Sequence, residues 1–143
     1  MLKPFLIILF GLFLFSFTDG LDQCSIYLNQ TMVGHWVEVD SAKTYTVKAN
    51  LDRDTLRFEY WTDYGGEMHA KLELRTMNDS IIHFIPFGKY ITSYGVYSFL
   101  LIKNKELIKK YNSFKVYVMQ TNPYAKDTAL AKTNYFVAIL KFN

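Results

Sequence analysis

The sequence predicts an all-β fold, either a small antiparallel barrel or a β-sandwich, of about eight strands with one short helix. Two observations lead to this prediction. Apolar and polar residues alternate through most of the chain after residue 20, and turn-forming residues interrupt the alternation roughly every dozen residues. Hydrophobic residues make up 50% of the chain and aromatic residues 17%, so the sequence has the apolar content of a buried core.

The first expected strand lies within MVGHWVEVD, residues 32–40. Strict alternation places Trp36 on one face with Glu38 and Asp40, and the opposite face is apolar apart from one histidine (Val33, His35, Val37 and Val39). A buried Trp36 would therefore carry two carboxylates inward unless a bulge changes the phase of the strand.

Three further strands are expected at 45–49, 56–60 and 68–75. They are separated by turns at 50–53 and 63–66, where Asn, Asp and Gly accept turn geometry. The charged residues between Glu67 and Arg75 fall on one face, which predicts a solvent-facing ladder of alternating charge (Glu67, His69, Lys71, Glu73 and Arg75).

The second half of the chain continues the pattern and contains the expected helix. Leu107, Ile108 and Tyr111 share one helical face within 104–111. The connections are short, which favours a meander of neighbouring strands. The remaining strands are expected at 80–85, 90–102, 114–121 and 134–142, with another possible helical turn near 127–131.

The chain begins with an expected secretory leader at 1–20. Lys3 precedes an uncharged apolar run at 5–17, which is shorter than a membrane span. Small residues at Thr18 and Gly20 favour cleavage after Gly20, leaving residues 21–143 as a single all-β domain. We therefore expect a secreted or periplasmic protein, with an uncleaved membrane anchor as the alternative.

Cys24 is the single cysteine, so it cannot form an internal disulfide. It is a candidate lipidation site of a bacterial lipoprotein, because Leu21 precedes it at the required spacing. Otherwise it is a free thiol or an intermolecular link. A membrane partner is expected only if Cys24 is lipidated or the leader is retained. Asn29 and Asn78 begin sequons that would accept glycans in a eukaryotic host.

Charge is distributed unevenly along the chain. Residues 21–80 contain six Lys or Arg against ten Asp or Glu, and residues 81–143 contain nine against two. This asymmetry predicts that early and late strands pair with complementary charge, and a bipolar surface that steers an anionic partner is the alternative.

The leader, the early Gly34-x-Trp36 strand and the series of hairpins together resemble the lipocalins and the bacterial lipocalin-like domains. This resemblance implies a barrel with Trp36 packed across one end. A closed barrel would bind a small apolar ligand. The expected lining residues are large and lie mostly on the apolar phase of their strands: Trp36, Phe58, Tyr60, Leu72, Phe84 and Tyr97.

Two other functions are compatible with the sequence. A protein-interaction or cell-surface module would have a filled core and an exposed aromatic patch around Trp61, Tyr64 and Tyr124. A hydrolase would place Glu38 or Asp40 in a cleft with a raised pKa.

The sequence contains no local nucleophile or phosphate-binding motif, so we expect a non-catalytic protein without a cofactor. The three histidines have no zinc-type spacing, so no metal site is expected. Nucleic acid is not an expected partner of an exported protein.

Overall fold

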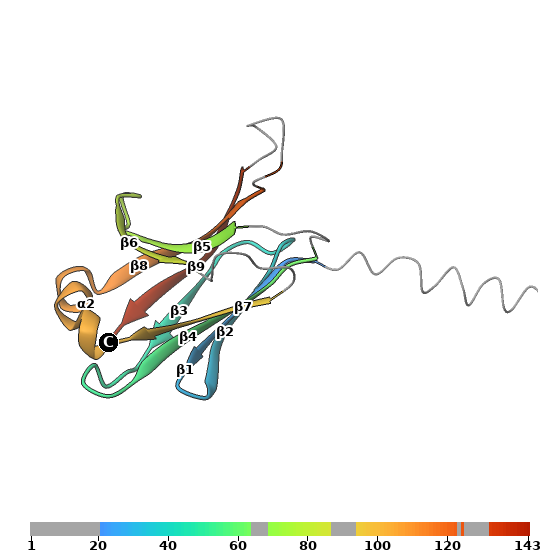
Figure 1. The fold of residues 1–143 in the computed structure, drawn as a ribbon. Coiled ribbons are helices and arrows are strands. Elements are labelled where there is room, and N and C mark those ends of the chain that lie inside the picture. Colours follow the sequence, from blue (N-terminus) through green and yellow to red (C-terminus); the bar gives the residue numbers. More distant parts are fainter. Residues whose placement is uncertain (1–20, 64–68, 87–93, 123, 125–131) are drawn as a thin grey trace, which may run out of the picture.

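The strands of this protein form two sheets that face each other across one core. The computed structural model describes residues 21–63, 69–86, 94–122, 124 and 132–143 (Figure 1). In order, the described elements are β1 (Gln23–Leu28), β2 (Thr31–Val37), β3 (Lys43–Val47), β4 (Thr55–Trp61), β5 (His69–Arg75), β6 (Ile81–Pro86), β7 (Tyr94–Leu100), the 3-10 turn η1 (Ile102–Asn104), α2 (Lys105–Tyr111), β8 (Ser113–Thr121) and β9 (Lys132–Phe142).

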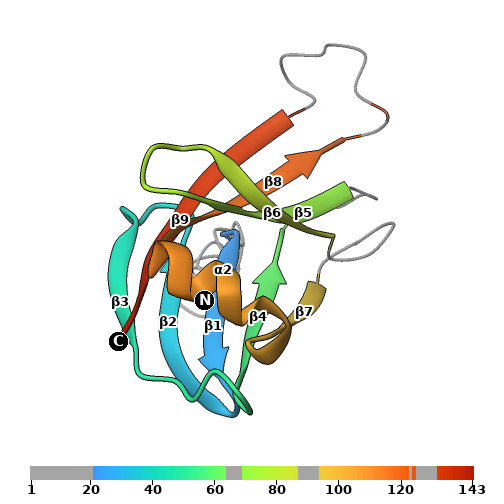
Figure 2. The same cartoon turned by 90° about the vertical axis from the view of Figure 1, so that its left-hand side faces the viewer.

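Sheet A has the strand order β2-β1-β4-β7, and sheet B has the order β3-β9-β8-β5-β6. Neighbouring strands are antiparallel except for β3 and β9, which are parallel. Figure 2 shows the two sheets from the end that α2 covers. The prediction of an all-β fold with one short helix is confirmed, and the described residues form two sheets rather than a closed barrel.

The predicted meander is wrong. Among the described strands, consecutive ones pair only in the β1–β2, β5–β6 and β8–β9 hairpins, and β4 lies between β1 and β7. Local turn chemistry fixes two of these hairpins, because Asn29 and Asp79 adopt φ of 56° and 63°. The other pairings join segments far apart in the chain, so no local pattern specifies them. The first strand, β1, is an addition to the predicted set, and its residues Cys24, Ser25 and Ile26 are buried in succession.

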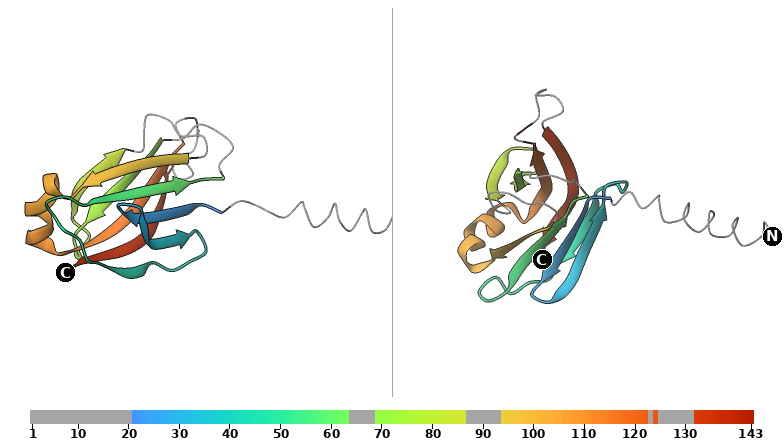
Figure 3. Two further views of the ribbon diagram at one scale, coloured as in Figure 1. Left: turned by 90° about the horizontal axis from the view of Figure 1, so that it is seen from below. Right: turned by 45° about the vertical axis from the view of Figure 1, so that its right-hand side comes forward.

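The core lies between the sheets, and α2 covers one end of it, as Figure 3 shows from two directions. Fully buried side chains come from both sheets, including Phe58 and Phe99 of sheet A and Leu72 and Val116 of sheet B. Ile108 is the buried residue of α2, and Leu107 and Tyr111 pack beside the core. The predicted helix and its apolar face are therefore confirmed.

Trp36 is buried, but Glu38 and Asp40, which strict alternation places on the same face, are not buried. The strand ends at Val37, and a turn follows, so Glu38 and Asp40 leave the alternation before they can point inward. The expected apolar face is also wrong in part, since His35 is exposed and Val39 is 76% exposed. The indole Nε1–H donates to the backbone oxygen of Asp40 at 3.2 Å, which closes this turn over the Trp36 ring.

A tyrosine joins the two sheets where β2 and β3 approach each other. The Tyr45 hydroxyl of sheet B donates to the backbone oxygen of His35 at 2.7 Å and accepts from the His35 N–H at 3.3 Å. A side chain therefore satisfies backbone groups at the edge of sheet A that a neighbouring strand would otherwise satisfy.

Two ion pairs of the described residues join the acidic first half of the chain to the basic second half. Lys115 of β8 lies 2.9 Å from Asp79 in the β5–β6 turn, and Lys105 of α2 pairs with Asp52. Both pairs join a late cation to an early carboxylate, but the other ion pairs of the described residues join residues of the same half. Pairing of early and late strands through complementary charge therefore stays a prediction.

Candidate functional site

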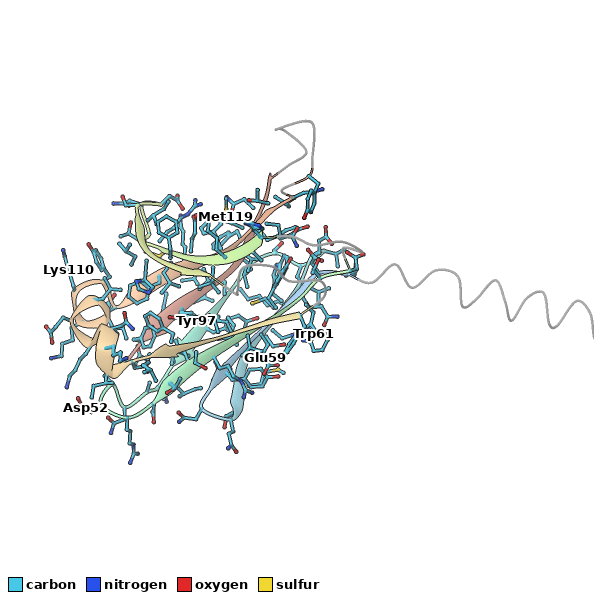
Figure 4. The ribbon with its side chains drawn as sticks, in the orientation of Figure 1. Asp52, Glu59, Trp61, Tyr97, Lys110 and Met119 are labelled. Carbon is cyan, nitrogen blue, oxygen red and sulfur yellow. The ribbon has the colours of Figure 1, made fainter. Side chains whose placement is uncertain are left out.

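The outer face of sheet A carries a group of partly exposed aromatic, apolar and charged side chains. Alternate residues of β1, β2, β4 and β7 point away from the core and lie side by side in the register of the sheet. Figure 4 shows Trp61 and Glu59 on this side of the molecule, whereas Tyr97 lies between the sheets. We call the following residues the outer patch: Tyr27, Met32, Arg57, Trp61, Tyr94 and Val96.

Trp61 and Tyr94 form the aromatic part of the outer patch. They are paired across β4 and β7, and their ring centroids are 4.1 Å apart at an interplanar angle of 39°. Trp61 is 47% exposed, Tyr94 is 39% exposed and Val96 is 42% exposed. Cross-strand packing therefore orients these side chains while much of their apolar area remains in water.

Arg57 links the aromatic residues to a half-buried carboxylate, that of Glu59. Its guanidinium lies 4.5 Å from the centre of the Tyr27 ring, and its Nε is 3.0 Å from Oε1 of Glu59. The Nε–H points away from any acceptor, so this ion pair acts through charge rather than through an aligned hydrogen bond. Partial burial and the charge of Glu59 raise the pKa of the Tyr94 hydroxyl.

The sequence identified Trp61 as an exposed aromatic residue, and the structure confirms its exposure. It also proposed Tyr64, which lies outside the described residues, and Tyr124, which is exposed but follows β8 of the other sheet. Tyr94 and Val96 were not proposed. Alternation could have found them, because they occupy the face opposite to Tyr97 on the same strand.

A second group of polar residues lies inside the fold. The Asp22 carboxylate accepts hydrogen bonds from the Tyr60 hydroxyl and the Gln120 amide, both at 2.6 Å, and from the Asp63 N–H at 3.2 Å. The Gln120 amide also donates to the Tyr60 hydroxyl. Burial, together with the hydrogen bond and charge of Asp22, holds the pKa of Tyr60 far above its usual value.

These groups connect the two sheets. Tyr60 belongs to β4 of sheet A, Gln120 belongs to β8 of sheet B, and Asp22 directly precedes β1. Asp22 and Gln120 are 3% and 8% exposed, and no Lys or Arg among the described residues pairs with Asp22. Both oxygens of this carboxylate already have protein partners, so the arrangement suits a polar clasp between the sheets.

The carboxylates proposed for a hydrolase have separate surroundings. Glu38 accepts a hydrogen bond from the Tyr135 hydroxyl at 3.0 Å, whereas the Asp40 carboxylate lies 3.8 Å from Nζ of Lys43. Burial and the charge of Asp22 raise the pKa of Tyr135, and Glu38 adds to this effect. The hydrolase interpretation stays a prediction, and the placement of these two carboxylates does not favour it.

The six proposed lining residues divide into three groups. Trp36, Phe58, Tyr60 and Leu72 are buried in the core, and Tyr97 is half-buried beside it. Phe84 was wrongly expected to point inward: it is 52% exposed, and Nζ of Lys71 lies 4.4 Å from its ring centre. The neighbouring His83 ring contacts Phe99 of the opposite sheet, so alternation directs Phe84 outward.

An open groove of about 540 Å³ lies beside the β5–β6 turn and the end of α2. Its walls combine apolar and hydroxyl-bearing side chains, and they do not include any of the six proposed lining residues. The residues that form it are Thr76, Met77, Asn78, Ser80, Ile81, Ile82, Tyr111 and Ser113.

The proposed modification sites differ in accessibility. Cys24 is fully buried in β1, and burial raises the pKa of its thiol to about 12. Attachment of a lipid or of another chain requires an accessible sulfur, so this fold favours a free thiol. Asn29 donates through Nδ2 to Asp54, whereas Asn78 lies exposed in the β5–β6 turn and is the more open sequon. The proposed leader at 1–20 lies outside the described residues.

The histidines occupy separate environments. His35 contacts Ser25 through Nδ1 at 3.0 Å on the outer face of sheet A, while His83 packs against Phe99. Among the residues that the structure describes, no three His, Cys, Asp or Glu side chains come together as metal ligands. None of the described helices has the length and apolar composition that a membrane span requires.

Comparison with protein-family models, curated proteins and solved structures finds no match for this chain.

Proposed function

We propose that this protein is a non-catalytic interaction module that binds a partner protein through the outer patch. The observation that carries the proposal is the Trp61–Tyr94 pair, which remains about half exposed although it packs in a fixed geometry. Trp, Tyr, Met and Arg are the residue types enriched at protein interfaces, and the outer patch combines all four.

The packing of the core supports this choice over an internal ligand. Phe58, Tyr60 and Leu72 each have 0% exposed area, so they border no space large enough to admit a water molecule. A ligand lined by these side chains would require the core to open. The burial of these three side chains and the exposed aromatic surface are features that we expect of an interaction module.

Site-specific photo-cross-linking tests the proposal. A photoreactive amino acid replaces Trp61 in cells that naturally make the protein, and the same amino acid at Met77 provides the control, because Met77 is 44% exposed but lies in the β5–β6 turn. We expect one predominant cross-linked protein, identified by mass spectrometry, from the Trp61 position only. Equal labelling from both positions, or no adduct from Trp61, contradicts the proposal.

A second candidate function is the binding of a small, partly apolar ligand in the groove beside α2. Its volume of about 540 Å³ lies within the usual range for ligand sites. Native mass spectrometry of protein from its own source would detect a retained ligand. Replacing Ile82 with Trp fills the groove and should abolish that extra mass, while Trp61→Ala should leave it unchanged.

A further inference from the structure

The strand β7 forms one edge of sheet A, and its backbone groups alternate in direction. The N–H of Thr55 donates to Oδ1 of Asn29, and the C=O of Thr55 accepts from the Asn29 N–H, so both groups point away from β7. Thr55 is paired with Leu100, whose C=O accepts instead from the Asn104 side chain. Thr55 and Leu100 are therefore a pair without mutual hydrogen bonds.

The Thr55–Leu100 pair fixes which residues of β7 direct their backbone N–H and C=O groups toward β4 and which direct them away from it. The β4–β7 register contains no shift, so Tyr94, Val96 and Ser98 behave as Leu100 does and direct N–H and C=O away from β4. No hydrogen bond from these six backbone groups to another segment is present in the described structure. The side chains of Tyr94, Val96 and Ser98 are exposed as well. In the described structure, this edge therefore has backbone N–H and C=O groups without a neighbouring strand, and side chains that are exposed to water.

The sequence of β7 does not protect this edge. Exposed edges usually carry a charge, a proline or a bulge that prevents pairing with another strand. Residues 94–100 read Tyr-Gly-Val-Tyr-Ser-Phe-Leu and contain neither charge nor proline. By contrast, the edge at β2 is occupied by the Tyr45 hydroxyl, and β3 carries Lys43.

The strand is also complementary to a copy of itself. Antiparallel pairing about a two-fold axis at Tyr97 places Val96 opposite Ser98 of the second copy, which aligns the unpaired backbone groups of both strands. The same register places Gly95 opposite Phe99 of the second copy, so glycine, which has no side chain, leaves room for the large Phe99 ring. Because β7 is uncharged, no like charges meet across this axis.

From these observations we infer that β7 pairs with β7 of a second copy, joining two A sheets into one continuous sheet. This inference deepens the proposed function by naming a second copy of the chain as a partner at the edge of the outer patch. The outer patches of the two copies then lie on the same face of the joined sheet, because two-fold antiparallel pairing keeps equivalent side chains on one side.

Analytical ultracentrifugation of the full chain over a concentration series tests the pairing. The wild type should form a dimer. Val96→Lys should weaken dimerisation about ten-fold or more, because it places two ammonium groups near the axis. Ser98→Pro should have a similar effect, since it removes an N–H that points to the free edge and leaves the β4–β7 hydrogen bonds in place. The control is Met77→Lys, which introduces the same charge at a comparably exposed site and should leave the dimer unchanged.

Disulfide trapping tests the register. In mixtures of Val96→Cys and Ser98→Cys chains, the mixed disulfide should form faster than either homodisulfide, because the two positions face each other only in the proposed pairing. A monomeric wild type overturns the inference, and so does a dimer that neither edge variant weakens or a mixture without preference for the mixed disulfide. Photo-cross-linking of Trp61 to a different protein by a monomeric chain would overturn the pairing and still support the proposed function.

Discussion

The Tyr45 ring lies where the side chain of any residue larger than glycine at position 34 would begin. A Cβ placed on Gly34 would be 2.8 Å from Cε2 and 2.9 Å from Cδ2 of Tyr45. The ring cannot move aside freely, because its hydroxyl is hydrogen-bonded to both backbone groups of His35. Gly34 therefore permits the contact by which sheet B satisfies the edge of sheet A.

We expect Gly34→Ala to destabilise the protein by about 1–3 kcal/mol, the usual cost of forcing an extra carbon into a packed site. Urea unfolding followed by circular dichroism measures the change. In a Tyr45→Ala background the same substitution should cost much less, because the ring is absent. An equal loss in both backgrounds would show that Tyr45 is not the reason for the glycine.

Tyr60→Phe should lower the free energy of unfolding by about 1–3 kcal/mol, because it removes a buried hydroxyl that donates to the Asp22 carboxylate. Tyr97→Phe is the matched control, since Tyr97 is half-buried beside the same core and forms no hydrogen bond through its hydroxyl in the described structure. Its effect should stay within about 0.5 kcal/mol. If both variants unfold at the same denaturant concentration, the polar clasp contributes no stability.

Glu73 should make the protein sensitive to acid. It lies on the face predicted to be a solvated ladder, yet it is 2% exposed beneath Lys71 and Arg75. Burial acts to raise the pKa of Glu73, but hydrogen bonds and charges from Arg75 and Lys71 outweigh burial and hold it below the ordinary value. A lowered pKa in the folded state stabilises the fold above the unfolded pKa of about 4.3, and this stability is lost as the pH falls through the folded pKa.

The free energy of unfolding, measured from pH 7 down to pH 3, should therefore decrease less steeply in Glu73→Gln than in the wild type. The variant should also be less stable at pH 7 by about 1–3 kcal/mol, since it loses charge-assisted hydrogen bonds. Glu106→Gln on the exposed side of α2 controls for the general loss of a carboxylate. Parallel curves for Glu73→Gln and the wild type would contradict the assigned role of Glu73.

Cys24 should be unreactive in the folded protein. Its thiol is fully buried and its pKa is raised to about 12, so the nucleophilic thiolate is scarce at neutral pH. Ellman's reagent should label less than a tenth of the thiol within the time that labels it completely in denaturant. Rapid labelling under native conditions would indicate that β1 detaches from the sheet, and it would support the lipidation hypothesis.

The sequence by itself determined the β character of the protein, a helix within 104–111 and the burial of Phe58, Tyr60 and Leu72. It could do so because alternation and turn chemistry are local, and the apolar faces they define must be covered in any fold. The exposure of Trp61 could be predicted for the same reason.

Only the tertiary structure decided which strands meet. Asp22 is 38 residues from Tyr60 and 98 residues from Gln120 in the sequence, so no local pattern connects them. The outward direction of Phe84 depends on a long-range contact, because the neighbouring His83 ring packs against Phe99 of the other sheet. The burial of Glu73 depends on the strands that flank β5, which place Phe84 and Tyr117 opposite it. The free edge of β7 is likewise a property of strand order. A strand is an edge only when folding has placed every possible neighbour elsewhere.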